Sequence, residues 1–362
     1  MANVLNPQLL RRGFLVFAAI SLLGFVGILI HSNNLPAFLA SVGKIHWIWL
    51  LVGLGLASMD WIGGGLRNWV VVNHIHPDPP LGGMMLAGGM GAWAGYLTPL
   101  NSGAGPMMIY GMRRAGVPLP VAVTATLITF VSTIAFFAIA GPLAILLGAG
   151  RSLGKHGDFL GLSLYQLFLA SLGTFVALGL LFIAIILFPA LVRDFVQWIA
   201  KHIGRRSSRV RERLEKVQAG IDAAHENLVA FNSPRGWWVI LQATILSGPS
   251  HANKLLAGYV ALRAVGVEAN FVDVLLLQTF ITFLLYFAPT PGASGIAEVL
   301  SAAVMSSVYL PAETIPLYTL IWRSILSYFT LGFGFFVFSH WISHRLKGVD
   351  DQPDTVEAAV AG

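Results

Sequence analysis

The sequence contains no cysteine. This absence excludes a disulfide framework, a thiolate metal site and a cysteine nucleophile. Charge is also scarce, because 10% of the 362 residues are Asp, Glu, Lys or Arg, whereas soluble globular proteins carry roughly a quarter. With 56% hydrophobic residues and a mean hydropathy of +0.75, the chain has too little polar surface to face water. We therefore expect an integral membrane protein.

The basic residues are distributed as in a membrane protein. The net charge of +6 does not indicate nucleic-acid binding, because Lys and Arg gather at the ends of apolar runs. The first apolar run, residues 14–30, follows Arg11 and Arg12. No small-residue cleavage site comes after it, so we interpret it as a spanning helix and not as a cleaved signal peptide.

Several stretches are long and apolar enough to cross a bilayer, which takes about 20 helical residues. The predicted fold class is therefore an all-α polytopic membrane protein with about six spanning helices. The predicted spans are 14–31, 46–66, 118–148, 161–191, 237–260 and 315–341.

Two further apolar stretches, 81–114 and 271–310, are interrupted near their middles by proline and glycine. The interruptions are Thr98–Pro106 and Pro289–Gly295. We expect each stretch to form a re-entrant helical hairpin, which returns to the side of the membrane from which it entered. The alternative is a set of ordinary spanning helices that are kinked at proline.

The charge distribution supports the re-entrant interpretation. With the N-terminus in the cytoplasm and both stretches re-entrant, most of the 22 Lys and Arg residues lie on the cytoplasmic side. If the first stretch spanned the membrane, the basic block 193–216 would lie outside. We therefore predict a multi-pass protein of the bacterial cytoplasmic (inner) membrane, with both termini in the cytoplasm.

Residues 1–347 are predicted to form a single integral membrane domain. Within it, 193–235 is a sizeable polar insert in which apolar residues recur at helical spacing among Arg, Lys and Glu. This pattern predicts a basic amphipathic helix on the cytoplasmic surface, which we interpret as a lipid anchor in preference to a regulatory partner site. The segment 348–362 is acidic and rich in small residues, and we expect it to be a disordered tail.

The two interruptions share the pattern Thr-Pro-x-x-Ser-Gly, at residues 98–103 and 290–295. Because one stretch would enter from the cytoplasm and the other from outside, the pattern predicts an inverted repeat. Non-helical backbone at this depth has to be buried in protein or face a water-filled cavity. Its free N–H groups attract anions, so we expect the two segments to meet near mid-membrane and line a site for an anionic group.

Three motifs resemble those of one membrane family. Residues 288–298, Ala-Pro-Thr-Pro-Gly-Ala-Ser-Gly-Ile-Ala-Glu, resemble a P-T-P-G-G-x-G-x-x-E motif. Residues 98–110 resemble a first motif through their Thr-Pro, Ser-Gly, Gly-Pro and Tyr elements, and Trp322-Arg323 resembles an L-W-R motif. The family is the flippase-like family named for the transmembrane region of lysylphosphatidylglycerol synthase. The resemblance covers about residues 14–341.

The resemblance implies a membrane protein that translocates a lipid or a lipid-linked substrate, and two departures bear on it. The aminoacyl-lipid branch of the family has Gly-Glu-x-x-Arg in the first motif, whereas here Pro106 follows Gly105 and Ile109 occupies the Arg position. The substrate of that branch therefore does not carry over. The synthases also have a large soluble catalytic domain after the membrane part, and we expect this chain to lack one.

Glu298, Arg323, Lys254 and Asp60 lie within apolar segments, where a charge is costly and indicates a function. We expect either that Glu298 and Arg323 lie close together or that Arg323 faces a lipid phosphate in the cavity. If they are close, the pair is structural, contacts the substrate, or does both. Lys254 either meets an anionic headgroup or extends to the outer interface. Asp60 serves helix packing or proton coupling, and the sequence does not choose between these roles.

We predict a flippase-like lipid transporter with a central cavity between the two hairpins. The cavity would admit a lipid or lipid-linked anionic headgroup, while the acyl chains stay in the bilayer. The sequence contains no catalytic or ATPase motif, so we predict no enzyme activity, no cofactor, no metal, and movement that is downhill or coupled to an ion gradient. The predicted substrate-binding residues are Thr98, Asn101, Ser102, Gly103, Tyr110, Lys254, Thr290, Pro291, Gly292, Ser294, Gly295, Glu298 and Arg323.

Two other functions remain open from the sequence. The chain could present a lipid to a separate cytosolic transferase that docks on 193–235, or it could transport small solutes or ions. The predicted partners are membrane lipids with anionic headgroups and no nucleic acid, while a cytosolic lipid-modifying enzyme and a homo-oligomer are left open. His74 and His76 superficially resemble metal ligands, but a short solvated loop without further ligands is the preferred interpretation.

Overall fold

A computed structural model describes residues 7–32, 35–147, 158–159, 162–187 and 229–345. Within these residues the chain is helical, apart from an antiparallel ribbon in which β1 (Asp158–Phe159) pairs with β2 (Leu162–Ser163). The predicted all-α class is therefore confirmed. Most of the predicted amphipathic insert, and the whole predicted tail, lie outside the described residues.

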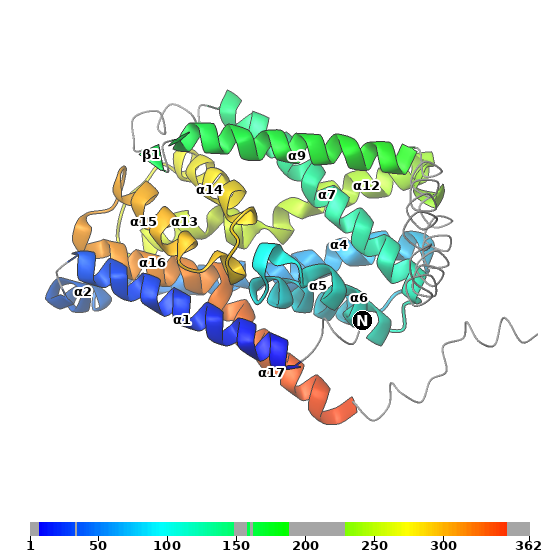
Figure 1. Cartoon of the computed structure of the whole chain (residues 1–362), viewed down its shortest axis with the longest axis horizontal. Coiled ribbons are helices and arrows are strands. Elements are labelled where there is room, and N and C mark those ends of the chain that lie inside the picture. Colours follow the sequence, from blue (N-terminus) through cyan, green and yellow to red (C-terminus); the bar gives the residue numbers. More distant parts are fainter. Residues whose placement is uncertain (1–6, 33–34, 148–157, 160–161, 188–228, 346–362) are drawn as a thin grey trace, which may run out of the picture.

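The long helices run mainly along the long axis of the molecule (Figure 1). Short 3-10 turns and one π-helical segment connect several of them; these are η1 (Pro99–Asn101), η3 (Pro291–Ala293), η4 (Ala312–Thr314) and the π-helical η5 (Ser324–Tyr328). The α-helices are α1 (Pro7–Ser32), α2 (Leu35–Val42), α3 (Trp47–Ala57), α4 (Met59–Ile75), α5 (Leu81–Tyr96), α6 (Ala104–Arg114), α7 (Leu119–Leu146), α9 (Leu164–Leu187), α12 (Pro234–Ser250), α13 (Ala252–Ala264), α14 (Phe271–Tyr286), α15 (Ile296–Ser306), α16 (Ile315–Arg323) and α17 (Phe329–Arg345).

The described chain contains helices that are long and apolar enough to cross a membrane. They correspond to four of the predicted spans, and the predicted spans 161–191 and 237–260 also form helices, namely α9 and the α12–α13 pair. The protein is therefore a polytopic helical membrane protein. The four apolar spans are Arg12–Ile30, Trp47–Ile75, Leu119–Leu146 and Ala312–Ser339.

Three long helical elements are interrupted along their length. Helix α3 passes into α4 at Ser58, α12 passes into α13 at His251, and α16 passes into α17 through η5. At the second break, Pro249 removes a backbone N–H from the helix. The predicted second span ended at residue 66, but α4 continues to Ile75. Arg67 therefore lies inside the helix, where it is buried.

Both interrupted stretches form hairpins and not kinked spanning helices. Helices α5 and α6 pack together and are joined through η1, while α14 and α15 pack together and are joined through η3. In Figure 1 the hairpins approach each other from opposite ends of the long axis. Their turns η1 and η3 are in contact. Two opposed hairpins with meeting turns are the arrangement of an inverted repeat.

The repeat extends beyond the two hairpins. Each half contains a broken span, a hairpin and a further span, in the order α3–α4, α5–α6, α7 and the order α12–α13, α14–α15, α16–α17. The two broken spans pack antiparallel, with α3 against α13 and α4 against α12. The Cα of Gly63 lies so close to α12 that an added Cβ would be 2.8 Å from Ser250. The breaks of the two spans therefore lie near their crossing point.

Large apolar side chains cover much of the outer surface. Leu23, Leu146 and Leu180, on α1, α7 and α9, are 71%, 83% and 64% exposed. A continuous apolar surface of this kind would be unfavourable in water, and it fits a protein surrounded by lipid. The charged groups considered below lie inside the bundle instead.

Close packing of α4 against α5 depends on glycine. A Cβ at Gly65 would lie 2.2 Å from the Cα of Met85, and a Cβ at Gly89 would lie 1.9 Å from the ring of Trp61. Both distances are far below van der Waals contact, so the helices reach this separation only because these positions carry no side chain. The first hairpin is held against the first broken span in this way.

We expect Gly65→Ala to lower the free energy of unfolding by roughly 1–3 kcal/mol, because the added methyl would overlap the backbone of Met85. Thermal unfolding of the detergent-solubilised protein, followed by tryptophan fluorescence, measures the change. Gly82→Ala on the same hairpin is the matched control, since no atom lies within 4 Å of its Cβ position. Equal unfolding midpoints for the two variants would contradict the packing argument.

Candidate functional site

The two hairpin turns have the same backbone shape. In each, an extended threonine and a proline are followed by two residues with positive φ. The φ angles are 53° and 55° at Leu100 and Asn101, and 54° and 55° at Gly292 and Ala293. Three of these four residues are not glycine, so their conformation is strained. Strain at matching positions in both repeats indicates a turn that serves a function.

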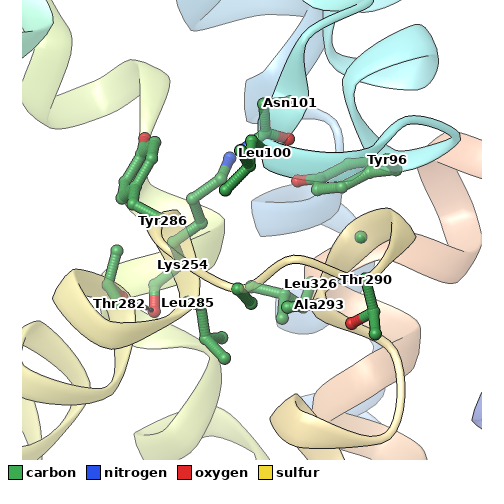
Figure 2. Close-up of a pocket in the computed structure, with 12 residues that line it drawn as sticks. Tyr96, Leu100, Asn101, Lys254, Thr282, Leu285, Tyr286, Thr290, Ala293 and Leu326 are labelled. Atoms are coloured by element: carbon green, nitrogen blue, oxygen red, sulfur yellow. Dashed lines mark hydrogen bonds between the residues drawn. The ribbon is translucent and has the colours of Figure 1, made fainter.

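A pocket lies where the two turns meet. Figure 2 shows Lys254 extending from α13 between Tyr286 and Tyr96. Of the described residues that line the pocket, only Lys254 is charged. The lining residues are Tyr96, Leu100, Asn101, Lys254, Thr282, Leu285, Tyr286, Ala288, Thr290, Gly292, Ala293 and Leu326.

Asp60 balances the charge of Lys254 across the two repeats. The Lys254 Nζ lies 3.0 Å from Oδ1 of Asp60 and 5.5 Å from the centre of the Tyr96 ring. Oδ2 of Asp60 accepts hydrogen bonds of 3.0 Å from Tyr96, Asn253 and Thr330. The Asp60 side chain is 2% exposed and that of Lys254 is 17% exposed. The carboxylate is thus an internal group, and the ammonium is the end of the pair that the pocket reaches.

The breaks in the two spans place these charges. Asp60 lies in the first turn of α4, directly after the break at Ser58, and Lys254 lies in the first turn of α13, after the break at His251. Backbone N–H groups at the start of α4 favour the negative charge of Asp60. The start of α13 likewise favours an anion beside Lys254. Because the two broken spans cross near their breaks, the side chains of Asp60 and Lys254 come into contact.

A second buried ion pair holds the turn of the second hairpin. Nε of Arg323 donates to Oε1 of Glu298 at 2.9 Å, and Nη2 donates to the carbonyl of Gly292 at 3.1 Å. Oε2 of Glu298 accepts the N–H of Gly295 at 2.7 Å, at the start of α15. Ser21 of α1 donates to the same carboxylate. The pair therefore connects α1, η3, α15 and α16.

Two aromatic rings lie against Arg323. Its guanidinium carbon lies 5.3 Å and 5.8 Å from the ring centres of Phe17 and Tyr328, and such contacts favour a cation in apolar surroundings. The Arg323 side chain is 1% exposed and does not line the pocket. Of the alternatives that the sequence left open, the geometry fits a structural pair with Glu298.

Four of the predicted binding residues line the pocket together, namely Asn101, Lys254, Thr290 and Gly292. Glu298 and Arg323 form the buried pair behind η3. Tyr110 lies away from the turn on α6, where its hydroxyl accepts a hydrogen bond of 3.2 Å from Arg114. The remaining predicted residues belong to the turns or their flanks without lining the pocket; these are Thr98, Ser102, Gly103, Pro291, Ser294 and Gly295.

Hydroxyl groups of the repeated motif bond to backbone. Thr98 donates to a carbonyl of α5 at 2.9 Å and accepts the N–H of Gly103 at 2.8 Å. Thr290 donates to the carbonyl of Ser294 at 2.9 Å, and Ser294 donates to the carbonyl of Pro291 at 2.9 Å. These bonds satisfy backbone groups that have left the helices, as non-helical backbone inside a membrane protein requires. The motif therefore builds the turns that carry the pocket.

Sequence reasoning missed much of the lining. Tyr96 and Tyr286 end the entering helices of the two hairpins, shortly before the turns, and Thr282 lies one helical turn before Tyr286. Side chains in the last turn before an interruption have to face the space around it, so their position could have indicated the lining. The link between Asp60 and Lys254 has no comparable local signal.

The comparison with protein families matches this architecture. The model described as "Lysylphosphatidylglycerol synthase TM region" matches residues 13–334. The chain belongs to this family. The match includes both hairpins and both buried ion pairs, and it confirms the resemblance seen in the motifs. No curated protein and no solved structure matches the chain. The family relates the protein to lipid handling in the membrane.

We expect Glu298→Gln and Arg323→Met each to lower the free energy of unfolding by about 3–5 kcal/mol, because each leaves an unpaired charge in the bundle. The double variant should lose less than the sum of the single losses, since it buries neither charge. Thermal unfolding in detergent measures this cycle.

Glu268→Gln is the matched control for Glu298→Gln in that cycle. Arg263 lies 3.6 Å from Glu268, whose side chain is 90% exposed, and such surface pairs contribute about 0–1 kcal/mol. Strictly additive losses for Glu298 and Arg323 would contradict their coupling.

Proposed function

We propose that this protein is a flippase-like lipid transporter, which takes the anionic headgroup of a lipid into the pocket between η1 and η3. The observation that carries the proposal is the position of Lys254. Its ammonium group lines a pocket where two opposed hairpins meet inside the bundle. Membership of a lipid-related membrane family supports a lipid as the substrate.

The lining of the pocket suits a lipid headgroup. Asn101 and Tyr286 offer polar groups near Lys254, while Leu285 and Leu326 provide apolar wall. An apolar wall with one cation and a few polar groups suits a phosphate-bearing headgroup that is attached to acyl chains.

Asp60 lowers the affinity of Lys254 for an anion. The carboxylate of Asp60 neutralises the ammonium and holds it in place at 3.0 Å. A lipid phosphate would share the ammonium with Asp60, because a Lys side chain has three donors. Binding of this kind is reversible, which transport requires. A lone buried ammonium would bind the headgroup more tightly and would slow its release.

The inverted repeat offers a route to both sides of the membrane. Each hairpin approaches the pocket from one end, so that rocking of one repeat against the other would open the pocket to one side at a time. The sequence has no ATP-binding motif, so we propose downhill movement or coupling to an ion gradient. The distribution of Lys and Arg supports the bacterial cytoplasmic membrane, with both termini in the cytoplasm, as the location.

We expect Lys254→Met to slow the movement of an anionic fluorescent lipid in proteoliposomes by at least about tenfold, because loss of a desolvated charge contact typically costs more than 1.4 kcal/mol. Phosphatidylglycerol and phosphatidylcholine with the same labelled acyl chain are compared. The anionic lipid should be moved faster by the wild-type protein, and the difference should vanish in the variant.

Two controls separate transport from folding. Lys44→Met makes the same change at an exposed residue between α2 and α3, and it should leave lipid movement unchanged. The double variant Asp60→Asn/Lys254→Met removes both charges, so it should fold without an unpaired carboxylate and should still be inactive. Wild-type rates in either Lys254 variant would overturn the assignment of the pocket, and absence of lipid movement in the wild type would overturn the proposed function.

A further inference from the structure

One buried charge in the described chain has no counter-charge. Asp60 pairs with Lys254, and Glu298 pairs with Arg323. Arg67, in the middle of α4, is 8% exposed, and it forms no ion pair with any residue that the structure describes. A guanidinium stays charged even when buried, and an unneutralised charge inside a membrane protein is costly. This cost indicates that an anion belongs beside Arg67.

The hydrogen bonds of Arg67 leave one edge of its guanidinium unused. Nη1 donates to the hydroxyls of Thr133 at 2.7 Å and Ser247 at 3.0 Å. These hydroxyls donate in turn to carbonyls of their own helices, α7 and α12, so they satisfy Nη1 without neutralising its charge. Nε is buried without a partner, and no described residue accepts from Nη2.

The unused edge has the geometry of an oxyanion site. Nε and Nη2 present two parallel N–H groups, the fork that binds two oxygens of a phosphate or carboxylate at once. The same α4–α7 interface holds a further buried group for which the described residues supply no partner, Nδ2 of Asn68, whose Oδ1 accepts a hydrogen bond from Thr129 of α7. The interface therefore has more hydrogen-bonding capacity than the protein itself uses, which is unusual for buried polar atoms.

Arg67 is close to the Lys254 pocket and separate from it. Ser247 bonds to Arg67 through its hydroxyl, and its carbonyl lies 2.8 Å from Nδ1 of His251. The ring of His251 lies 6.3 Å from that of Tyr286, which lines the pocket. Arg67 itself does not line the pocket. Contacts through Ser247 and His251 thus place Arg67 near the wall of the pocket.

We infer that Arg67 forms a second anion site between α4, α7 and α12, and that its ligand is an oxyanion of the phosphate class. The site does not depend on the proposed transport function. Its phosphate could come from free phosphate or from a lipid headgroup, which share the same oxygens. The two sources differ in the acyl chains that come with a headgroup, and ligands with and without chains distinguish them.

The test measures the thermal unfolding midpoint of the purified full chain in detergent. Inorganic phosphate and dihexanoyl phosphatidate are titrated separately, against chloride at equal ionic strength. We expect a saturable rise of the midpoint with at least one of them, because a ligand that binds the folded state stabilises it. A rise with phosphate alone assigns the free ion, and a rise at lower concentration with phosphatidate assigns a headgroup.

In the Lys254→Met background, where the pocket cation is absent, Arg67→Met should abolish the saturable rise. In phosphate-free buffer the midpoint of Arg67→Met alone should equal or exceed that of the wild type, because replacement of an unpaired buried charge by an apolar side chain removes a cost. A purely structural Arg67 would instead lower this midpoint. Arg67→Lys keeps the charge and loses the two parallel N–H groups, so the apparent affinity of the protein for the oxyanion should fall by about tenfold or more. This variant replaces Arg67→Met in the test if the Met variant fails to fold.

Lys254→Met should keep the saturable rise, and this separates the Arg67 site from the pocket. A response of wild-type size in Arg67→Met or Arg67→Lys, each made in the Lys254→Met background, would overturn the inference. Loss of the response in Lys254→Met would assign the anion to the pocket and would also overturn it. So would a wild-type protein that responds to neither ligand beyond the effect of chloride.

Discussion

Backbone groups buried inside a membrane protein have no bulk water to bond to, and this constraint governs how the two hairpin turns are built. The turns leave the helical ladder where the two repeats meet, so each has to satisfy its own N–H and carbonyl groups. Thr98 and Thr290 do so with their side chains. In the second turn, Arg323 and Glu298 bond directly to the backbone of Gly292 and Gly295. The pocket is lined by residues of these two non-helical turns.

The charges of the bundle follow from the same constraint. Each buried acid serves several donors at once, since Asp60 takes up Lys254 and three neutral groups. Lys254 differs from Arg323 in one respect, because its charged end borders the pocket while Arg323 is buried against two aromatic rings. Similar ion pairs therefore have different roles. One joins the repeats and presents a cation to the pocket, and the other braces a turn.

Arg67 shows how far a charge count along the chain can mislead. Because it follows the end of a predicted span, the sequence assigns it to the cytoplasmic surface. In the structure α4 continues for two further turns, and Arg67 is buried. Its hydroxyl partners come from α7 and α12, which lie 66 and 180 residues further along the chain. No local pattern in the sequence distinguishes this arginine from those at the membrane surface.

The sequence by itself determined the helical membrane class, the two interrupted stretches and their opposed orientation. These features depend on hydropathy, on the positions of proline and glycine, and on which apolar runs the basic residues flank. All of these are properties of short segments. Tertiary structure decided the breaks at Ser58 and His251, the pairing of Asp60 with Lys254, the burial of Arg323, and the position of Arg67 away from every acidic residue that the structure describes. The physical reason is that an ion pair depends on distances of a few ångströms between helices that are far apart in the chain. Only packing of the two repeats against each other fixes those distances.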